Sequence, residues 1–89
     1  MIEVKWGDSF KHKYLKIIKK NPKFKEIFID KIIDFSSDPF SASLKTHKLS
    51  GQFSDYWSFS IDYKTRVIFR FINDTTILLL SIGSHDEVY

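Results

Sequence analysis

The spacing of apolar residues changes twice along this chain, from every second residue to every third or fourth and back again. At the start, Ile2, Val4 and Trp6 alternate with charged residues, which predicts a strand with one buried face near the edge of a sheet. Helical spacing follows as far as about residue 35 and is interrupted at Asn21 and Pro22. The N-terminal part therefore predicts one strand followed by two helices.

The two helices are expected to form a hairpin because the link between them is short. A side-chain oxygen of Asp8 or Ser9 is expected to cap the first helix. The second helix is expected to run from Pro22 to about Phe35, since asparagine is a good cap and proline fits the first helical position. The apolar residues that these helices are expected to bury are Phe10, Tyr14, Ile17, Ile18, Phe24, Ile27, Phe28 and Ile32.

The second half of the chain returns to a period of two after a polar segment. Ser, Thr, Asp, Pro and Lys dominate residues 36–51, which predicts a connecting loop with one short helical turn near residues 41–44. A hairpin is expected next, with Trp57, Phe59, Ile61 and Tyr63 on the apolar face of its first strand, and Val67, Phe69 and Phe71 on that of its second.

The last strand is expected at residues 76–82, where nearly every position is apolar, as in a central strand. The predicted order is β-α-α-β-β-β. This order indicates an α+β fold in which the helical hairpin packs on one face of a mainly antiparallel four-stranded sheet.

The length of 89 residues predicts a single domain spanning residues 1–89. Without cysteine the chain cannot form disulfides or thiolate metal sites. The longest aliphatic run, Ile77 to Leu80, is too short to span a membrane. We therefore expect a cytoplasmic protein that does not contact membranes.

The net charge of +3 is unevenly distributed. Residues 1–48 contain eleven lysines and six acids, a balance of +5, whereas residues 49–89 have a balance of −2. Positive potential concentrated in one region favours binding of a polyanion, although lysines on helices are also common as simple solvated surface. The candidate RNA-binding residues in this region are Lys16, Lys19, Lys20 and Lys23.

Three segments carry a resemblance to a known family. They are His47-Lys48-Leu49-Ser50-Gly51, the stretch Tyr63 to Phe69, and the ending Ile82 to Tyr89. In this order and spacing they resemble the RelE/ParE superfamily of type II toxins, and most of all its RelE, YoeB and YafQ branches. The resemblance covers the whole chain and implies a RelE-like fold.

Several functional expectations follow from this resemblance alone. Toxins of these branches are ribosome-dependent mRNA endoribonucleases that need neither a metal nor another cofactor. Each is silenced by a cognate antitoxin that wraps around it. The expected partners are thus the antitoxin, the ribosome and mRNA, with a monomer when free and a hetero-oligomer with the antitoxin.

RNA cleavage without metal requires a base, an acid and a cation that stabilises the phosphate. Histidine suits both proton-transfer roles because its unperturbed pKa of about 6.5 lies near working pH. The resemblance points to His85 as general acid or base and to His47 as the second proton-transfer group. A solvent-exposed loop histidine remains the alternative for His47. Which of the two is the acid stays open.

The remaining site candidates are cationic or aromatic. Arg66 matches the family arginine and offers a guanidinium for phosphate; the alternative is a cross-strand salt bridge to an acid such as Asp62. Alternation places Arg70 on the same face as Arg66. Lys48 is a candidate phosphate contact or a residue without a role. Tyr89 resembles the terminal aromatic that stacks on a base or assists proton transfer, with simple packing on the sheet as the alternative.

The chain also departs from its relatives. Ser60 stands where YafQ-like toxins have another histidine, and Lys64-Thr65 replaces an acid followed by tryptophan. Two other functions therefore remain as hypotheses. One is a ParE-like inhibitor of DNA gyrase, against which the C-terminal histidine argues, and the other is a catalytically inert member that still binds antitoxin.

Overall fold

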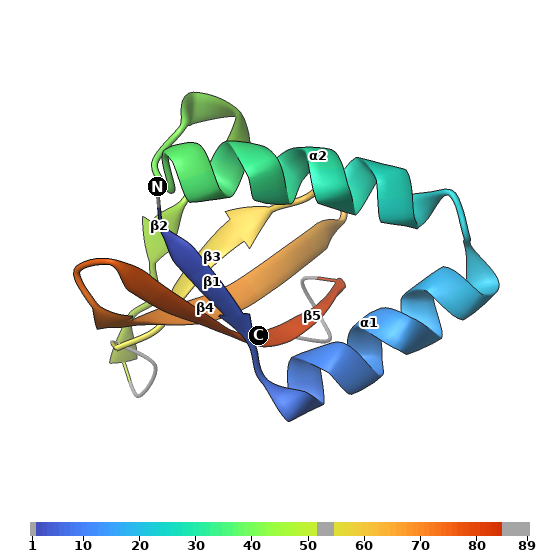
Figure 1. The fold of residues 1–89 in the computed structure, drawn as a ribbon, viewed down its shortest axis with the longest axis horizontal. Helices are drawn as coiled ribbons and strands as arrows, with labels where there is room; N and C mark the ends of the chain where they lie inside the picture. Colours follow the sequence, from blue (N-terminus) through green and yellow to red (C-terminus); the bar gives the residue numbers. More distant parts are fainter. Residues whose placement is uncertain (1, 52–54, 85–89) are drawn as a thin grey trace.

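A computed structural model describes residues 2–51 and 55–84 of the chain. Its elements in chain order are β1 (Glu3–Trp6), α1 (Asp8–Lys20), α2 (Phe24–Ser37), the 3₁₀ turn η1 (Ala42–Leu44), β2 (His47–Lys48), β3 (Trp57–Ser60), β4 (Thr65–Asn73) and β5 (Thr76–Ser84). Both helices lie on the same side of one sheet and meet at the link between them (Figure 1). The predicted α+β arrangement is therefore confirmed, including the short helical turn.

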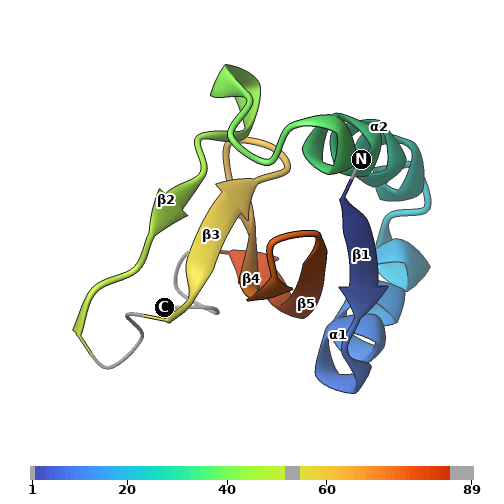
Figure 2. The same ribbon diagram turned by 60° about the vertical axis from the view of Figure 1, so that its left-hand side comes forward.

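The sheet has five strands in the order β1-β5-β4-β3-β2. β1 is parallel to β5, whereas the other neighbours are antiparallel. The predicted edge position of the first strand and central position of the last are both confirmed. The prediction of four strands is wrong, because His47 and Lys48 pair with β3 as a strand of their own. Two residues are too few to show a period of two in the sequence. Figure 2 shows β2 and β3 at the side of the sheet away from α1.

The helix starts differ from the predicted ones. The N-cap of α1 is Gly7, and neither Asp8 nor Ser9 forms the expected side-chain cap. The α2 helix begins at Phe24 instead of Pro22, because the residues after Asn21 first form a turn in which the Phe24 amide donates to the Asn21 carbonyl (3.0 Å). No helix in residues 2–51 or 55–84 is long and apolar enough to cross a membrane.

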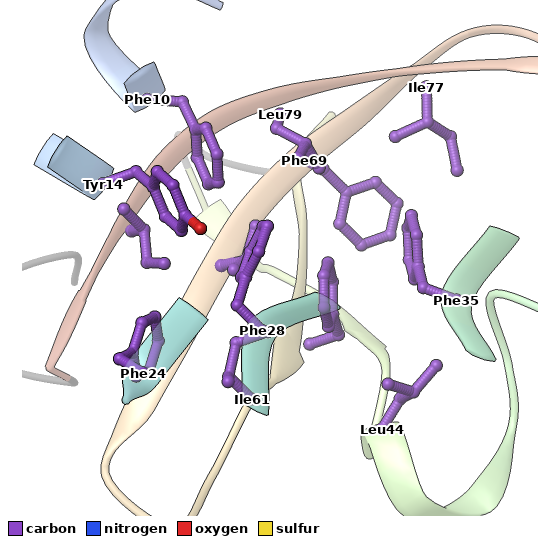
Figure 3. Close-up of a cluster of buried hydrophobic side chains, with 13 residues drawn as sticks. Phe10, Tyr14, Phe24, Phe28, Phe35, Leu44, Ile61, Phe69, Ile77 and Leu79 are labelled. Atoms are coloured by element: carbon purple, nitrogen blue, oxygen red, sulfur yellow. The ribbon is translucent and has the colours of Figure 1, made fainter. Parts of the chain in front are cut away.

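Aromatic side chains form most of the core between the helices and the sheet. Phe10 and Tyr14 of α1 and Phe28 of α2 surround Trp6 with ring centroids 5.1–5.4 Å away. Figure 3 shows the helix residues converging on side chains of β4 and β5. Such edge-to-face contacts add to the free energy gained from burial of apolar area. This packing holds α1 against β5.

Two residues that the spacing placed inside lie at the surface. Ile27 is 43% exposed because the buried face of α2 passes through Phe24, Phe28 and Phe35. Tyr63 is 88% exposed because β3 ends at Ser60, so alternation no longer applies beyond that residue.

β5 extends beyond its parallel partner. β1 pairs with β5 from Thr76 to Leu79, whereas β5 continues to Ser84. A β-bulge lies at Leu80, since the β4 register changes from Phe69↔Leu79 to Ile68↔Ser81. The second half of β5 therefore extends past the end of β1, on the side where α1 lies.

Candidate active site and nucleic-acid interface

The face of the sheet opposite the helices, here called the open face, carries two neighbouring rows of side chains. Its position follows from the pairing, because Val67 and Ile82 form one pair of the core and their strand neighbours point the other way. The first row contains His47, Ser58, Ile68 and Ser81. The second row contains Ser60, Arg66 and Gly83.

His47 is exposed on the edge strand β2 instead of in a loop. Its Nδ1 lies 3.1 Å from the backbone carbonyl oxygen of Lys45. A carbonyl oxygen only accepts hydrogen bonds, so Nδ1 must carry the hydrogen if this bond forms. In the neutral ring Nε2 then keeps a lone pair, as a general base requires.

Arg66 is held by backbone carbonyls of the β3–β4 turn. Its Nη1 donates to the carbonyls of Asp62 (2.9 Å) and Thr65 (3.4 Å), and its Nη2 donates to that of Tyr63 (3.2 Å). Three hydrogen bonds leave at least two of the five N–H donors of a guanidinium for an anion. Within the described residues, Arg66 contacts the backbone carbonyl of Asp62 and forms no salt bridge with its carboxylate, so that alternative is wrong.

The Asp62 carboxylate shapes the same turn. Its Oδ1 accepts from the backbone N–H groups of Lys64 (3.0 Å) and Thr65 (2.7 Å). Such a side-chain contact stabilises a tight turn in place of a backbone hydrogen bond. Asp62 therefore fixes the carbonyls that hold Arg66.

His47 and Arg66 share the open face but do not touch. Their backbones are two strands apart and two residues apart along the strand direction. Standard sheet spacings make these separations about 10 Å across the strands and about 7 Å along them. The guanidinium of Arg66 leans toward the turn, away from the His47 row. Arg70 lies on the same face as Arg66, as predicted, and is exposed.

A small pocket of about 260 Å³ adjoins Arg66. Two further cations line it, Lys31 from α2 and Lys45 from the residue after η1. Neither lysine was among the site residues predicted from the sequence. Lys31 carries no signal in the sequence, whereas Lys45 stands only two residues before His47.

The predicted lysines separate into two groups. Lys16, Lys19 and Lys20 line a groove between α1 and the end of β5. Lys23 follows α1 and does not line this groove. Lys48 is the strand neighbour of His47, so the pairing places it on the opposite face of β2.

Two predicted site residues, His85 and Tyr89, lie outside the described residues. The described chain ends at Ser84, whose backbone is opposite Thr65, next to the row of Arg66. In the described part of the chain, no group of three His, Cys, Asp or Glu side chains could hold a metal ion.

The chain matches a model of a known protein family. The family model described as a bacterial toxin of a type II toxin–antitoxin system, YafQ, matches residues 2–89. No curated protein is similar enough in sequence to count as a match.

Several solved structures share this fold. A copper-bound mutant toxin from Helicobacter pylori is 20% identical with a TM-score of 0.82, and each chain is covered completely. The YoeB/ParE toxin from Agrobacterium tumefaciens is 21% identical with a TM-score of 0.78, over 94% of this chain and 99% of that one. YafQ in the DinJ–YafQ complex from E. coli is 15% identical with a TM-score of 0.70, over 100% of this chain and 99% of that one. At these identities the similarity concerns the fold.

Proposed function

This chain belongs to the YafQ family of bacterial toxins of type II toxin–antitoxin systems, and we propose that it is an endoribonuclease that cuts mRNA on the ribosome. The proposal rests on one observation above all. His47 and Arg66 lie on the same open face, and each is oriented by backbone carbonyl oxygens. A proton acceptor and a cation on one face of the sheet are two of the three groups that metal-free RNA cleavage needs.

In the proposed reaction, Nε2 of His47 takes the proton of a ribose 2′-hydroxyl. The 2′-oxygen attacks the adjacent phosphorus, which produces a 2′,3′-cyclic phosphate and breaks the bond to the 5′-oxygen. His85 donates the proton that this leaving oxygen needs, and the free N–H donors of Arg66 stabilise the added negative charge. Tyr89 stacks on a base beside the cut.

Cationic side chains around the site are proposed to hold the RNA. Arg70 shares the open face and binds the cleaved strand, whereas Lys16, Lys19 and Lys20 extend the positive surface along α1. Lys23 and Lys48 lie off the open face and are kept as further RNA-binding candidates.

The family implies an antitoxin partner, and the E. coli structure with the same fold is a DinJ–YafQ complex. We propose that this chain is a cytoplasmic monomer when free and forms a hetero-oligomer with its cognate antitoxin. Bound antitoxin would inhibit the toxin by preventing ribosomal mRNA from reaching the open face.

The test is a ribosome-dependent cleavage assay on wild type, His47→Ala, His85→Ala and Arg66→Lys, with His12→Ala as control because His12 is an exposed residue of α1. We expect the rate to fall about 100-fold or more in each histidine variant, which is the usual contribution of a general acid or base. The His12 variant should cleave like wild type.

The proposal is overturned if wild type and both histidine variants arrest growth equally and leave ribosome-bound mRNA intact. Intact RNA together with inhibition of gyrase supercoiling by the pure protein would instead identify a ParE-like gyrase inhibitor. Tight antitoxin binding without any toxicity would identify an inert member.

A further inference from the structure

A groove of about 860 Å³ lies between α1 and the second half of β5. It is lined by Lys13, Lys16, Ile17, Lys19, Lys20, Ile82 and Gly83. We propose that this groove, here called the α1–β5 groove, binds the phosphodiester backbone of single-stranded RNA and leads it onto the open face. The inference rests on the proposed ribonuclease function for the identity of that strand.

Lys13 connects the α1–β5 groove to the open face. Its Nζ lies 2.9 Å from Oγ of Ser81, which belongs to the same row as His47. Lys13 reaches this position because β1 stops opposite Leu79 and does not cover Ser81. Lys13 therefore joins the groove to the β5 end of the row that contains His47.

Lys13 and Ser81 together offer two donors to one anion. An ammonium has three N–H donors and gives one to Ser81, whose oxygen accepts it. The Ser81 hydroxyl then has its own hydrogen to donate outward. A phosphate at this place would receive one charged and one neutral hydrogen bond from atoms already fixed relative to each other.

Among the described residues, the lining of the groove contains four lysines and no acid, and none of these lysines forms an ion pair with another described residue. Lys13, Lys16 and Lys20 are spaced i, i+3 and i+7, so they follow one side of the helix for about 10 Å at 1.5 Å per residue. A row of unpaired cations of this length matches a polymer of regularly spaced negative charges.

An RNA strand fits this lining better than an acidic segment of a protein. Stable protein interfaces have an apolar and aromatic centre in which charged residues, lysine above all, are depleted. The α1–β5 groove has lysines along its length, and its large apolar side chains are two isoleucines and no aromatic residue among the described residues. Nucleic-acid backbones, in contrast, are bound mainly through such cations.

The test measures binding of the full-length protein to a fluorescein-labelled 2′-O-methyl oligonucleotide by anisotropy over a range of salt concentrations. This probe lacks the 2′-hydroxyl nucleophile, so it reports binding whether or not the protein cleaves RNA. The variants are Lys13→Gln, Ser81→Ala and the triple Lys13→Gln/Lys16→Gln/Lys20→Gln. Lys11→Gln is the matched control, since Lys11 is an exposed α1 residue outside the groove lining.

Each contact between a lysine and a phosphate contributes about −0.7 to the slope of log K against log salt for single strands. We expect Lys13→Gln to reduce the slope by about 0.7 and the triple variant by about 2. Ser81→Ala should weaken binding about threefold to tenfold without changing the slope, because a neutral donor releases no counterion. Lys11→Gln should bind like wild type.

Equal losses of oligonucleotide affinity in Lys11→Gln and Lys13→Gln would overturn the inference, since affinity would then depend on the total charge of the protein and not on the groove. Lysine-dependent binding of poly-glutamate with no binding of the oligonucleotide would also overturn it in favour of an acidic protein partner. Lysine-dependent oligonucleotide binding by a protein that does not cleave ribosomal mRNA would support the groove while the ribonuclease proposal fails. If the triple variant cleaves ribosomal mRNA normally and keeps its oligonucleotide affinity, the groove proposal fails while the ribonuclease proposal stands.

Discussion

Nδ1 of His47 lies 3.1 Å from the carbonyl oxygen of Lys45, a residue whose φ of 53° places it in the left-handed region. This conformation ends the 3₁₀ turn and directs the chain into β2. The orientation of the His47 ring thus depends on a backbone conformation that residues other than glycine and asparagine seldom adopt.

Replacement of Lys45 should separate the effect of this conformation from the effect of its charge. Lys45→Asn and Lys45→Val both remove the cation, but asparagine tolerates the left-handed region and valine does not. We expect Lys45→Val to lower the free energy of unfolding by about 1–2 kcal/mol relative to Lys45→Asn. Cleavage by the valine variant should fall further, because His47 loses its acceptor. Equal stability and equal cleavage in the two variants would contradict this, as measured by urea unfolding and the ribosome assay.

Asp62 is expected to act on Arg66 through the turn. Asp62→Ala removes the acceptor of the Lys64 and Thr65 N–H groups, and we expect it to cost about 0.5–1.5 kcal/mol of unfolding free energy, because water can replace the acceptor in this turn. The rate of the cleavage step should fall while oligonucleotide affinity stays near wild type, since no cation is lost. Asp62→Asn keeps the side-chain oxygen and should restore both stability and rate. A rate unchanged in Asp62→Ala would show that the turn does not position Arg66.

The fold could largely be predicted because its strands and helices are long enough to repeat a period. The apolar run of β5 indicated a central strand, and alternation placed Arg66 and Arg70 on one face. β2 was missed because its two residues carry no period. Its pairing with β3 depends on where the rest of the sheet lies.

The parts of the site that were not predicted depend on local irregularities. Alternation counted from Leu79 places Ser81 toward the core, but the bulge at Leu80 moves Ser81 to the open face and Ile82 into the core. The contact with Lys13 could not be foreseen without that bulge. Likewise, the carbonyl contacts of Arg66 depend on the dihedral angles of a turn, which spacing does not specify.

Gly7 is required by a close approach of two backbones. A Cβ at this position would lie 2.8 Å from the carbonyl oxygen of Leu79, which already accepts a hydrogen bond from the Gly7 N–H at 2.9 Å. We expect Gly7→Ala to lower the free energy of unfolding by about 1–3 kcal/mol, as other overpacking substitutions do. Gly51→Ala is not a suitable control because φ there is +67°, so Ser9→Ala, at an exposed first-turn residue of α1, serves instead. Urea unfolding that gives equal values for both variants would contradict the steric argument.

Tyr14 should make the stability of the fold depend on alkaline pH. Burial raises the pKa of its phenol above the ordinary value of 10.0, because the charged phenolate is less well solvated inside the protein. Below pH 10.0 both the folded and the unfolded chain keep the phenolic proton of Tyr14. Above it the unfolded chain releases its proton first, so stability falls as pH rises from 10.0 toward the folded-state pKa.

Tyr14→Phe removes this contribution, and the variant should therefore lose less stability than wild type between neutral pH and about pH 11. Near pH 7 the two proteins should unfold at similar urea concentrations, since the ring packing against Trp6 and Phe28 is kept. Tyr63→Phe is the control, because that side chain is 88% exposed and its replacement should leave the wild-type pH dependence unchanged. Identical pH profiles for wild type and Tyr14→Phe would show that the buried phenol does not set the alkaline limit of the fold.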